Sequence, residues 1–342
     1  MRKFLVIAIS IAVNTGSAFA VGSGGYENQV PHARSMGKAN LGAASANDAS
    51  ATFYNPALLT SASEEISIGG VYQTLEGDYS GPAGNDSLQQ DAAFTPNFHF
   101  SNRMETHPFA FGLSVTVPQG LATEWSAEGP LRYVATKSDL AVTAVTPALG
   151  IQFPNNISIG IGVDYFIANT AEFERRLSVS NLNFALGGTG GEPDGTQKLS
   201  GDGEDAGMVF GFHWAPSELD SVGVSYHAGA HIDIDGDLTL NGLSNESAFV
   251  FGGTDYTTKA KSELVIPASL QLGYARKFGT TVVEIGGQWN DWSDFKEQVV
   301  SFENLWRAYG RARRGKRARP AVARYELDAE SRLFDLQARL QA

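Results

Sequence analysis

The sequence has no cysteine, few charged residues and no apolar stretch long enough for a membrane-spanning helix. Without cysteine, neither a disulfide framework nor a cysteine metal site is available to the chain. Charged residues make up 18% of the sequence, whereas a soluble domain averages about 25%. The apolar stretch Phe4–Val13 has about half of the roughly 20 residues that a transmembrane helix needs. The composition therefore excludes a disulfide-stapled module and gives no sign of a helical membrane protein.

Positive charge is also scarce. There are 25 Lys and Arg against 37 Asp and Glu, which gives a net charge of −12. Proteins that bind nucleic acids neutralise phosphates with clustered Lys and Arg, so we expect no nucleic-acid partner. The chain also lacks a nucleophile motif of the Gly-x-Ser-x-Gly type. We therefore expect that it is not an enzyme.

The N-terminus has the pattern of a secretory signal peptide. Arg2 and Lys3 form a short positive region, an apolar stretch follows, and Ala18-Phe19-Ala20 matches the small-x-small pattern that signal peptidase reads. We predict a signal peptide over residues 1–20, cleaved near Ala20.

The rest of the chain divides into three parts by composition. Residues 21–60 are rich in Gly, Ala, Ser and Asn, as in a compact plug or a disordered leader. Residues 61–302 alternate between apolar and polar residues, which is typical of strands. Residues 303–342 do not alternate, and Arg307–Arg324 contains eight basic residues and no acidic one. We interpret this tail as non-native, for example an out-of-frame translation; the alternative is a basic tail that binds lipopolysaccharide phosphates.

The alternating runs have the length of tilted membrane strands, about 9 to 11 residues. Glycine is frequent, with 38 residues, and aromatic residues reach 11%, which suits a barrel whose outer band faces lipid. Some connections are short, such as Pro154–Asn156, and others are long and polar, such as Gly187–Gly203. A soluble all-β sandwich would alternate in the same way, so periodicity alone leaves both folds open. The expected strands are a run from Ile66 and the runs Ala92–Ser101, Pro108–Val117, Leu140–Phe153, Ile157–Ala168, Phe173–Val179, Gly207–Ala215, Ser221–His227, His231–Leu240, Leu264–Ala275 and Thr281–Trp289.

Six short motifs, in family order over residues 33 to about 302, resemble the FadL family of outer-membrane transport proteins. The first, Asn47 to Ala57, is a small-residue stretch that leads into an Asn-Pro-Ala triplet. The other five motifs are Pro96-Asn97-Phe98-His99-Phe100, Gly120-Leu121-Ala122-Thr123-Glu124-Trp125, Ile232-Asp233-Ile234-Asp235-Gly236, Leu264-Val265-Ile266-Pro267 and Trp292-Ser293-Asp294-Phe295. Each motif is weak alone, and the six together make a specific match.

The resemblance implies an antiparallel transmembrane β-barrel, fourteen-stranded in the family, with a small N-terminal hatch. In that family a ligand enters an outer apolar groove, moves to an interior pocket and leaves sideways where the third strand kinks inward. The chain would then be a multi-pass, monomeric protein of the outer membrane of a Gram-negative bacterium. Its partners would be outer-membrane lipid and a long-chain fatty acid or another hydrophobic small molecule, taken up by diffusion.

Four residues are gating candidates under this resemblance: Asn55, Pro56, Ala57 and Gly120. Pro56 lacks a backbone donor and fixes φ, and Asn55 can bridge to backbone groups freed by a strand kink. Gly120 lies where the kink is expected. An ordinary turn at Asn55-Pro56 and an ordinary strand end at Gly120 are the alternatives. Burial of a C16 chain could contribute on the order of 10 kcal/mol, and a rigid pocket that used all of it would hold the ligand too long for transport. We therefore expect residues 21–57 to move, which weakens binding and releases the ligand.

Four residues are candidates for the ligand pocket: Leu121, Phe100, Arg132 and Lys137. The two basic side chains could meet a carboxylate head group. No motif fixes the pocket, and the sequence does not distinguish a fatty acid from an aromatic hydrocarbon.

Two polar clusters have spacings that suggest metal sites but do not fit them. Asp233 as the first residue of a calcium loop would place Leu238 where glycine is required. His227 and His231 are four residues apart, which on a strand means roughly 13 Å. We therefore expect no metal ion and no cofactor.

Residues 61–302 suffice for roughly ten or eleven strands at barrel spacing, so the final strands of the family fold are apparently missing. We interpret the chain as C-terminally truncated or frameshifted. Two alternatives to transport stay open: a structural or surface-antigen barrel that transports nothing, and a non-functional truncated copy.

Overall fold

The computed structural model describes residues 6–8, 27–28, 32–89, 92–104, 106–185, 188–293 and 336. The chain forms two compact units, Met1–Trp289 and Asn290–Ala342, and the fold below is that of the first unit. The predicted cleavage near Ala20 and, apart from Leu336, the tail 303–342 lie outside the described residues. Both stay predictions.

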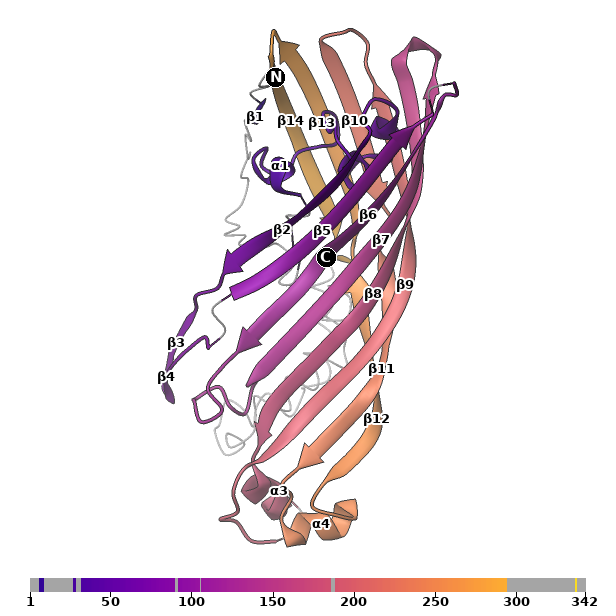
Figure 1. Cartoon of the computed structure of the whole chain (residues 1–342). Helices are drawn as coiled ribbons and strands as arrows, with labels where there is room; N and C mark the ends of the chain where they lie inside the picture. Colours follow the sequence, from indigo (N-terminus) through magenta and orange to yellow (C-terminus); the bar gives the residue numbers. More distant parts are fainter. Residues whose placement is uncertain are drawn as a thin grey trace. The chain divides into compact units, whose positions relative to one another are not determined.

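The first unit is built mainly from long antiparallel strands (Figure 1). The strands are β1 (Val6–Ala8), β2 (Glu65–Thr74), β3 (Asp78–Gly81), β4 (Gly84–Ser87), β5 (Ala92–Arg103), β6 (Phe109–Glu124), β7 (Lys137–Phe153), β8 (Ile157–Leu177), β9 (Gly195–Trp214), β10 (Asp220–His227), β11 (Ala230–Asn241), β12 (Tyr256–Ile266), β13 (Ala268–Phe278) and β14 (Thr281–Asp291). The helical segments are α1 (Ala33–Met36), α2 (Ala51–Tyr54), η1 (Pro56–Thr60), η2 (Pro154–Asn156), α3 (Val179–Ala185) and α4 (Asn245–Phe251). None of these described helices is long and apolar enough to cross a membrane.

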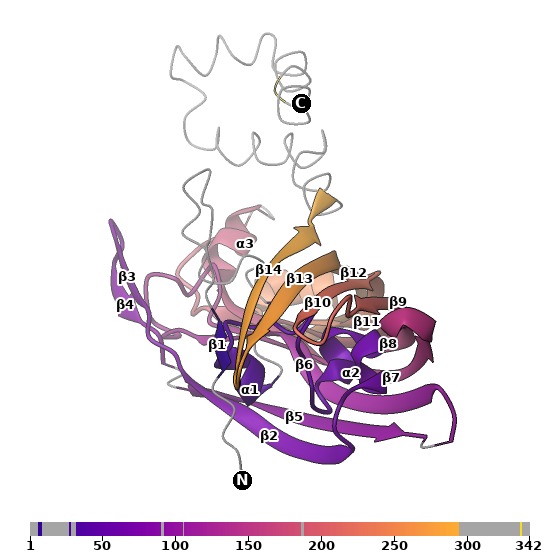
Figure 2. The same cartoon turned by 90° about the horizontal axis from the view of Figure 1, so that it is seen from above.

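One twelve-stranded sheet contains all strands except the β3–β4 hairpin. Its order is β1-β14-β13-β10-β9-β8-β7-β6-β5-β2, and β11 pairs with both β9 and β12. Viewed from above, the sheet curls around α1 and α2 (Figure 2). We call the end of the sheet that carries α3 and α4 the loop end. We use the name hatch for the predicted residues 21–60, of which 27–28 and 32–60 are described.

We call the twelve-stranded sheet the wall. Its burial pattern is the reverse of that in a soluble protein. The wall positions that face the hatch carry small or polar side chains, and the opposite face carries large apolar ones. The buried set includes Ser114, Thr116, Thr146, Ser158 and Ser225, and the exposed set includes Leu149, Ile159, Ile161, Phe210, Phe212, Trp214 and Leu272. A sandwich would bury its apolar face between two sheets, whereas a membrane barrel turns it toward lipid. The structure therefore excludes the sandwich and confirms the predicted all-β, antiparallel barrel fold with an N-terminal plug.

Three predicted boundaries differ from the structure. β8 continues through the gap predicted after Ala168, because a register shift between Ala168 and Ala171 interrupts its alternation. β9 begins at Gly195, inside the predicted loop Gly187–Gly203. The predicted strand Leu264–Ala275 is divided at Pro267 into β12 and β13, since proline cannot donate to a strand ladder.

The edges of the sheet concern two further predictions, the signal peptide over residues 1–20 and the missing final strands. Among the described residues, pairing runs from β2 to β14, and no pairing joins these two strands. Val6–Ala8, inside the predicted signal peptide, pairs in parallel with β14. The absence of further strands concerns residues after 293 and stays a prediction.

Candidate functional site

The described hatch residues 32–60 form a compact unit inside the curled sheet. Asn55 ends α2 and caps η1, because its side-chain oxygen accepts a hydrogen bond from the amide of Ala57 at 3.1 Å. Pro56 occupies the first position of η1, where its missing donor costs nothing. An apolar cluster that includes Tyr54 and Leu59 packs the hatch against Ala110 of β6 and Ala148 of β7.

A set of wall glycines allows the hatch backbone to touch the wall. Gly150, Gly160 and Gly211 are cross-strand neighbours on β7, β8 and β9. A Cβ atom at Gly150 would lie 2.8 Å from the carbonyl oxygen of Pro56, and one at Gly160 would overlap the amide nitrogen of Ala57. Other wall glycines lie equally close to the hatch, in contact with its backbone or, at Gly112, with its side chains. We call the full set the glycine row: Gly112, Gly150, Gly160, Gly211, Gly223 and Gly273. Residues 43–60 of the hatch are therefore seated directly on the wall.

Asn55 joins the hatch to β9. Its side-chain amide nitrogen donates to the carbonyl oxygens of Ala43 at 2.7 Å and Phe212 at 3.0 Å. The sequence suggested that Asn55 bridges to backbone freed by a kink in the third strand. The structure places the bridge on β9 instead, where Phe212 has regular partners on both sides.

The third long strand, β6, does have an irregularity near the expected position. Its pairing with β7 shifts register between Thr116 and Gln119. Gly120 is paired with Ala141 just after this bulge, and a Cβ atom there would meet Leu140 at an ordinary 3.5 Å. The structure therefore does not bring Gly120 together with Asn55, Pro56 and Ala57, which contact β7, β8 and β9.

Residues 27–28, which we call the strap, lie against the β6 bulge. Glu27 forms an isolated bridge with Gln119, and the amide of Asn28 donates to the carbonyl oxygen of Pro118 at 2.6 Å. The Asn28 side chain donates to Thr95 on β5 at 2.9 Å and accepts from Gln73 on β2 at 3.1 Å. The strap thus satisfies backbone groups that the bulge leaves free.

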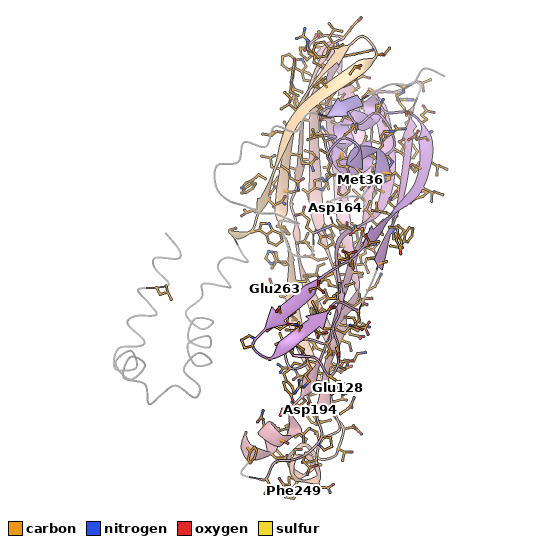
Figure 3. All side chains as sticks on the ribbon, turned by 90° about the vertical axis from the view of Figure 1, so that its left-hand side faces the viewer. Met36, Glu128, Asp164, Asp194, Phe249 and Glu263 are labelled. Carbon is orange, nitrogen blue, oxygen red and sulfur yellow. The ribbon has the colours of Figure 1, made fainter. Side chains whose placement is uncertain are left out.

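Two buried carboxylates lie on the face of the wall that is turned toward the hatch, and sequence reasoning missed both. Glu284 of β14 is fully buried and accepts hydrogen bonds from the amide of Ala44, at 3.0 Å, and from the hydroxyl of Ser45. Asp164 of β8 bonds to His227 at 2.6 Å and to Thr146 at 2.5 Å. Figure 3 shows Asp164 at the level of Met36 in the hatch. Neither carboxylate interrupts the alternation of its strand, so no pattern in the sequence marks it.

The histidine spacing seen in the sequence has a different meaning in the structure. His227 bonds to Asp164, and its ring centroid lies 5.6 Å from that of Phe53 in the hatch. His231 pairs with Glu263 at 2.8 Å on the exposed face. Among the described residues, no group of three or more His, Asp or Glu side chains is arranged to hold a metal ion.

The hatch contains its own charged cluster. Arg34 and Asp48 form an ion pair at 2.5 Å. Burial alone would raise the pKa of Asp48, but hydrogen bonds from Ser50 and the nearby charges of His32 and Arg34 outweigh it, so the pKa is lowered. Burial lowers the pKa of His32 below its usual value.

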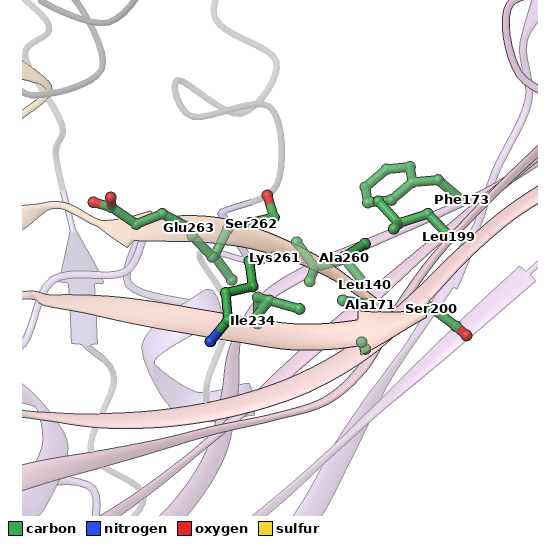
Figure 4. Close-up of a pocket in the computed structure, with 13 residues that line it drawn as sticks. Leu140, Ala171, Phe173, Leu199, Ser200, Ile234, Ala260, Lys261, Ser262 and Glu263 are labelled. Atoms are coloured by element: carbon green, nitrogen blue, oxygen red, sulfur yellow. The ribbon is translucent and has the colours of Figure 1, made fainter. Parts of the chain in front are cut away.

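An apolar cavity of about 150 Å³ lies between β7, β8, β9, β11 and β12 (Figure 4). Its lining residues are Leu140, Ala171, Phe173, Leu199, Ser200, Gly201, Ile234, Gly236, Ala260, Lys261, Ser262, Glu263 and Leu264. Phe173 and Leu199 are direct cross-strand partners and lie together in Figure 4. The cavity adjoins a buried apolar cluster formed by β7, β8 and β11, against which Leu121 packs.

The other three predicted pocket residues lie away from this cavity. Phe100 is on the outer face, where its ring is 5.6 Å from that of Phe111. Lys137 pairs with Glu172 at 3.1 Å, on the strand face opposite to that of Leu140. Arg132 lies in the loop between β6 and β7 and pairs with Asp194 at 3.5 Å. Of the four, only Leu121 packs against the cluster that adjoins the cavity, and the pocket roles of all four stay predictions.

An antiparallel wall with an apolar outer face, an interior hatch and an apolar cavity are the features of outer-membrane transport barrels. The model of the family described as "Outer membrane protein transport protein (OMPP1/FadL/TodX)" matches residues 12–314. The chain belongs to this family. The match extends past residue 302 into the part interpreted from sequence as a non-native tail.

Individual relatives agree with this assignment. The chain is 25% identical over 318 residues to a long-chain fatty acid transport protein of Escherichia coli O6:H1, with 85% of this chain and 70% of the relative covered. It also shares its fold with three solved structures. These are a Pseudomonas aeruginosa FadL homologue (TM-score 0.62, 21% identity, 80% of this chain and 71% of that chain), the Ralstonia pickettii toluene transporter TbuX (0.58, 21%, 77% and 72%) and the P. putida toluene transporter TodX (0.56, 20%, 72% and 66%).

Proposed function

We propose that this protein is a channel for passive uptake of hydrophobic small molecules across the outer membrane, with sideways release at the β6 bulge. The observation that carries the proposal is the strap, which pairs with Pro118 and Gln119 where the register of β6 is broken. Removing the strap would leave wall backbone groups without partners in a strand that already lacks regular pairing. A lateral opening at that point therefore needs little further disruption of the wall.

The hatch has a fixed part and a part suited to move. Residues 43–60 touch the glycine row and donate or accept hydrogen bonds on β5, β8, β9, β10 and β14. The strap is held by a short bridge and a few side-chain hydrogen bonds. Within the gating segment that the sequence placed over residues 21–57, we propose the strap as the part that moves.

The size and lining of the cavity indicate the chemistry of the ligand. An apolar cavity of about 150 Å³ can hold a benzene ring, and the cavity here has this volume. It fits a single aromatic ring or a segment of an acyl chain, each of which gains about 0.8 kcal/mol per buried methylene equivalent. Relatives of the chain are described as fatty acid and toluene transporters, and both ligand classes are included in the proposal.

The loop end offers exposed apolar side chains for a first contact with ligand. Phe184 on α3 is 63% exposed, and Phe249 and Val250 on α4 are 91% and 57% exposed. Figure 3 shows Phe249 at the bottom end of the wall, far below Asp164. Capture would occur here, before the ligand reaches the cavity. The proposal also includes a monomeric state, cleavage of the signal peptide near Ala20, outer-membrane lipid as the surrounding partner, and no catalytic activity.

A reversible cross-link tests the role of the strap, since the chain has no cysteine of its own. Glu27→Cys with Gln119→Cys would join the bridged pair, because opposed strand residues have Cβ atoms about 4.5–5.5 Å apart. We expect the oxidised variant to lose uptake of labelled toluene and palmitate and to regain it on reduction. The measurement is uptake into cells that lack other such channels.

The matched control joins the fixed part of the hatch to the wall. Thr60→Cys with Ser158→Cys replaces two hydroxyls that are 2.8 Å apart, and its oxidation should leave uptake unchanged. Unimpaired uptake by the oxidised strap variant would contradict gating by the strap. Absence of uptake by the unmodified chain would instead favour a barrel that transports nothing.

A further inference from the structure

The wall has a second interruption, between β9 and the strand pair β10–β11. Both β10 and β11 lie along the same edge of β9. Pairing of β9 with β10 ends at Val209 opposite His227, and pairing of β9 with β11 begins at Asp202 opposite Asp235. Eight residue steps from His227 to Asp235 therefore face seven steps of β9. Residues 203–208 of β9 keep their partners on β8, and residues 230–234 keep theirs on β12, but the register assigns no pairs between residues 203–208 and residues 229–234, all of them described. We call these two stretches the seam.

At the seam, β11 lies against the inner face of β9 instead of beside it. A Cβ atom at Gly203 would overlap the carbonyl oxygen of Asp233, and one at Gly207 would overlap that of Gly229. Gly229 itself has a φ of +72° and lies against Pro267, which separates β12 from β13. The β10–β11 and β12–β13 connections therefore lie side by side at the same level.

The inner side of the seam is apolar and adjoins the cavity. Ala230, Ile232 and Ile234 belong to the buried apolar cluster, and Ile232 is completely buried. Ile234 also lines the cavity of about 150 Å³, together with Gly201 of β9. Displacing Ile232 would therefore connect the cavity with the seam.

The outer side of the seam lies where the apolar band of the wall ends. Met208 is 40% exposed and continues the outward series of Phe210 and Phe212 on β9. Farther toward the loop end the outer face is charged, with His231 paired to Glu263 and Lys261 paired to Asp235 at 2.6 Å. In the membrane this is the level at which acyl chains give way to head groups.

We propose that the seam is a second lateral passage, which connects the interior cavity with the outer leaflet and admits uncharged apolar molecules. Separation of β9 and β11 at this point breaks no ladder of paired residues. It breaks the bond from the amide of Ala228 to Met208, at 2.9 Å, and that from the amide of His231 to the Asp205 carboxylate, at 2.8 Å. The carboxylates of Glu204 and Asp233 flank the outer side and repel an anionic head group. This inference rests on the proposed transport function but not on the strap.

A disulfide across the seam tests the passage. Met208→Cys with Ala228→Cys would close its lipid side, because these two residues are joined by the last backbone hydrogen bond before the seam. The control is Phe212→Cys with Val224→Cys, an opposed pair on the same two strands where pairing is regular. We expect oxidation of the seam variant to reduce uptake of labelled toluene severalfold, reversibly, and oxidation of the control to have no effect. Unchanged toluene uptake with the seam disulfide fully formed would overturn the proposal.

Hydrogen exchange of the full chain in lipid vesicles tests the seam without transport. Residues 230–234 are paired with β12 only, whereas residues 235–240 are paired with both β9 and β12. The amides of residues 230–234 that point toward β9 should therefore exchange about tenfold faster than the corresponding amides of residues 235–240. Equal protection of the two stretches would refute an openable seam, even in a chain that transports. Failure of toluene uptake in every variant, with fast exchange at the seam, would refute the transport function and leave the openable seam standing.

Discussion

Ala57 lies so close to β8 that a Cβ atom at Gly160 would overlap its amide nitrogen. Glycine inside a strand normally weakens it, because the residue packs no side chain and loses more entropy on folding. Here that cost is offset by direct contact between the hatch backbone and the wall. The contact can be removed by adding a single methyl group.

Gly160→Ala should therefore loosen the hatch. We expect a loss of about 1–3 kcal/mol in the free energy of unfolding, as for other overpacked sites, and faster proteolysis within residues 40–60. Urea titration and limited proteolysis measure the two effects. Gly287→Ala on β14 is the control, since a Cβ atom there has no neighbour within 4 Å. A Gly160→Ala protein as stable and as resistant as the control would show that the close contact is not needed.

Asp48 gives the hatch a dependence on pH. Its pKa is lower in the folded protein than the usual value of about 3.9, despite burial, because of Ser50, His32 and Arg34. The carboxylate therefore contributes stability that is complete above the unfolded pKa and is lost as the pH falls through the lowered one.

Asp48→Asn should reduce stability at pH 7, by about 1–3 kcal/mol for the hydrogen bonds to charged groups that are lost. The difference from the unmodified chain should shrink as the pH falls below about 4. Thermal unfolding between pH 3 and 7 measures this, with Asp78→Asn in the exposed β3–β4 hairpin as the control. A gap that stays constant across this range would contradict the assigned role of the charge.

At the scale of elements, alternation and turn residues predicted most of the strands. The Pro154–Asn156 turn is present, with Asn155 and Asn156 both at positive φ. Alternation failed where the physics of the strand changed. The bulge after Ala168 inserts a residue and reverses the faces, and the loop end of β9 alternates among polar residues that a hydropathy pattern cannot distinguish from a loop.

The candidate site was less predictable than the fold. The motifs identified Asn55 and the approximate position of the β6 irregularity. They could not show that Asn55 would reach β9, or that Phe100 and Lys137 would face outward, because a single register step turns every side chain of a strand to the other face. Glu284 and Asp164 are recognisable only once the wall has curled around the hatch.

β9 crosses from the apolar band to the charged loop end, so substitutions along it should differ in cost. Phe210 and Asp202 share the outward face and are eight residues apart, roughly 26 Å along the strand. Phe210→Arg should cost about 2–4 kcal/mol of folding free energy in a bilayer, and Asp202→Arg about 1 kcal/mol or less. Urea titration in lipid vesicles, read by gel mobility of unboiled samples, compares the two. Equal costs would show that β9 does not cross a lipid boundary between these residues.

For the molecule as a whole, the hatch connects parts of the wall that are distant in sequence. The Asn28 side chain accepts a hydrogen bond from Gln73 on β2 at 3.1 Å, and Ala44 both donates to Glu284 on β14 and accepts from Ser221 on β10. Ala44 and Glu284 are separated by 240 residues. The hatch is thus in contact with the first and the last long strands of the described sheet.

These contacts give the hatch a role in construction as well as in gating. Strands alone do not fix the curvature of a sheet, because the same ladder can form around interiors of different width. The glycine row lets several strands approach the hatch to the same short distance. Residues 43–60 therefore act as a template that sets the radius of the wall. Without residues 43–60 the wall would have no fixed radius. We therefore expect their removal to leave an irregular sheet and not a wider pore.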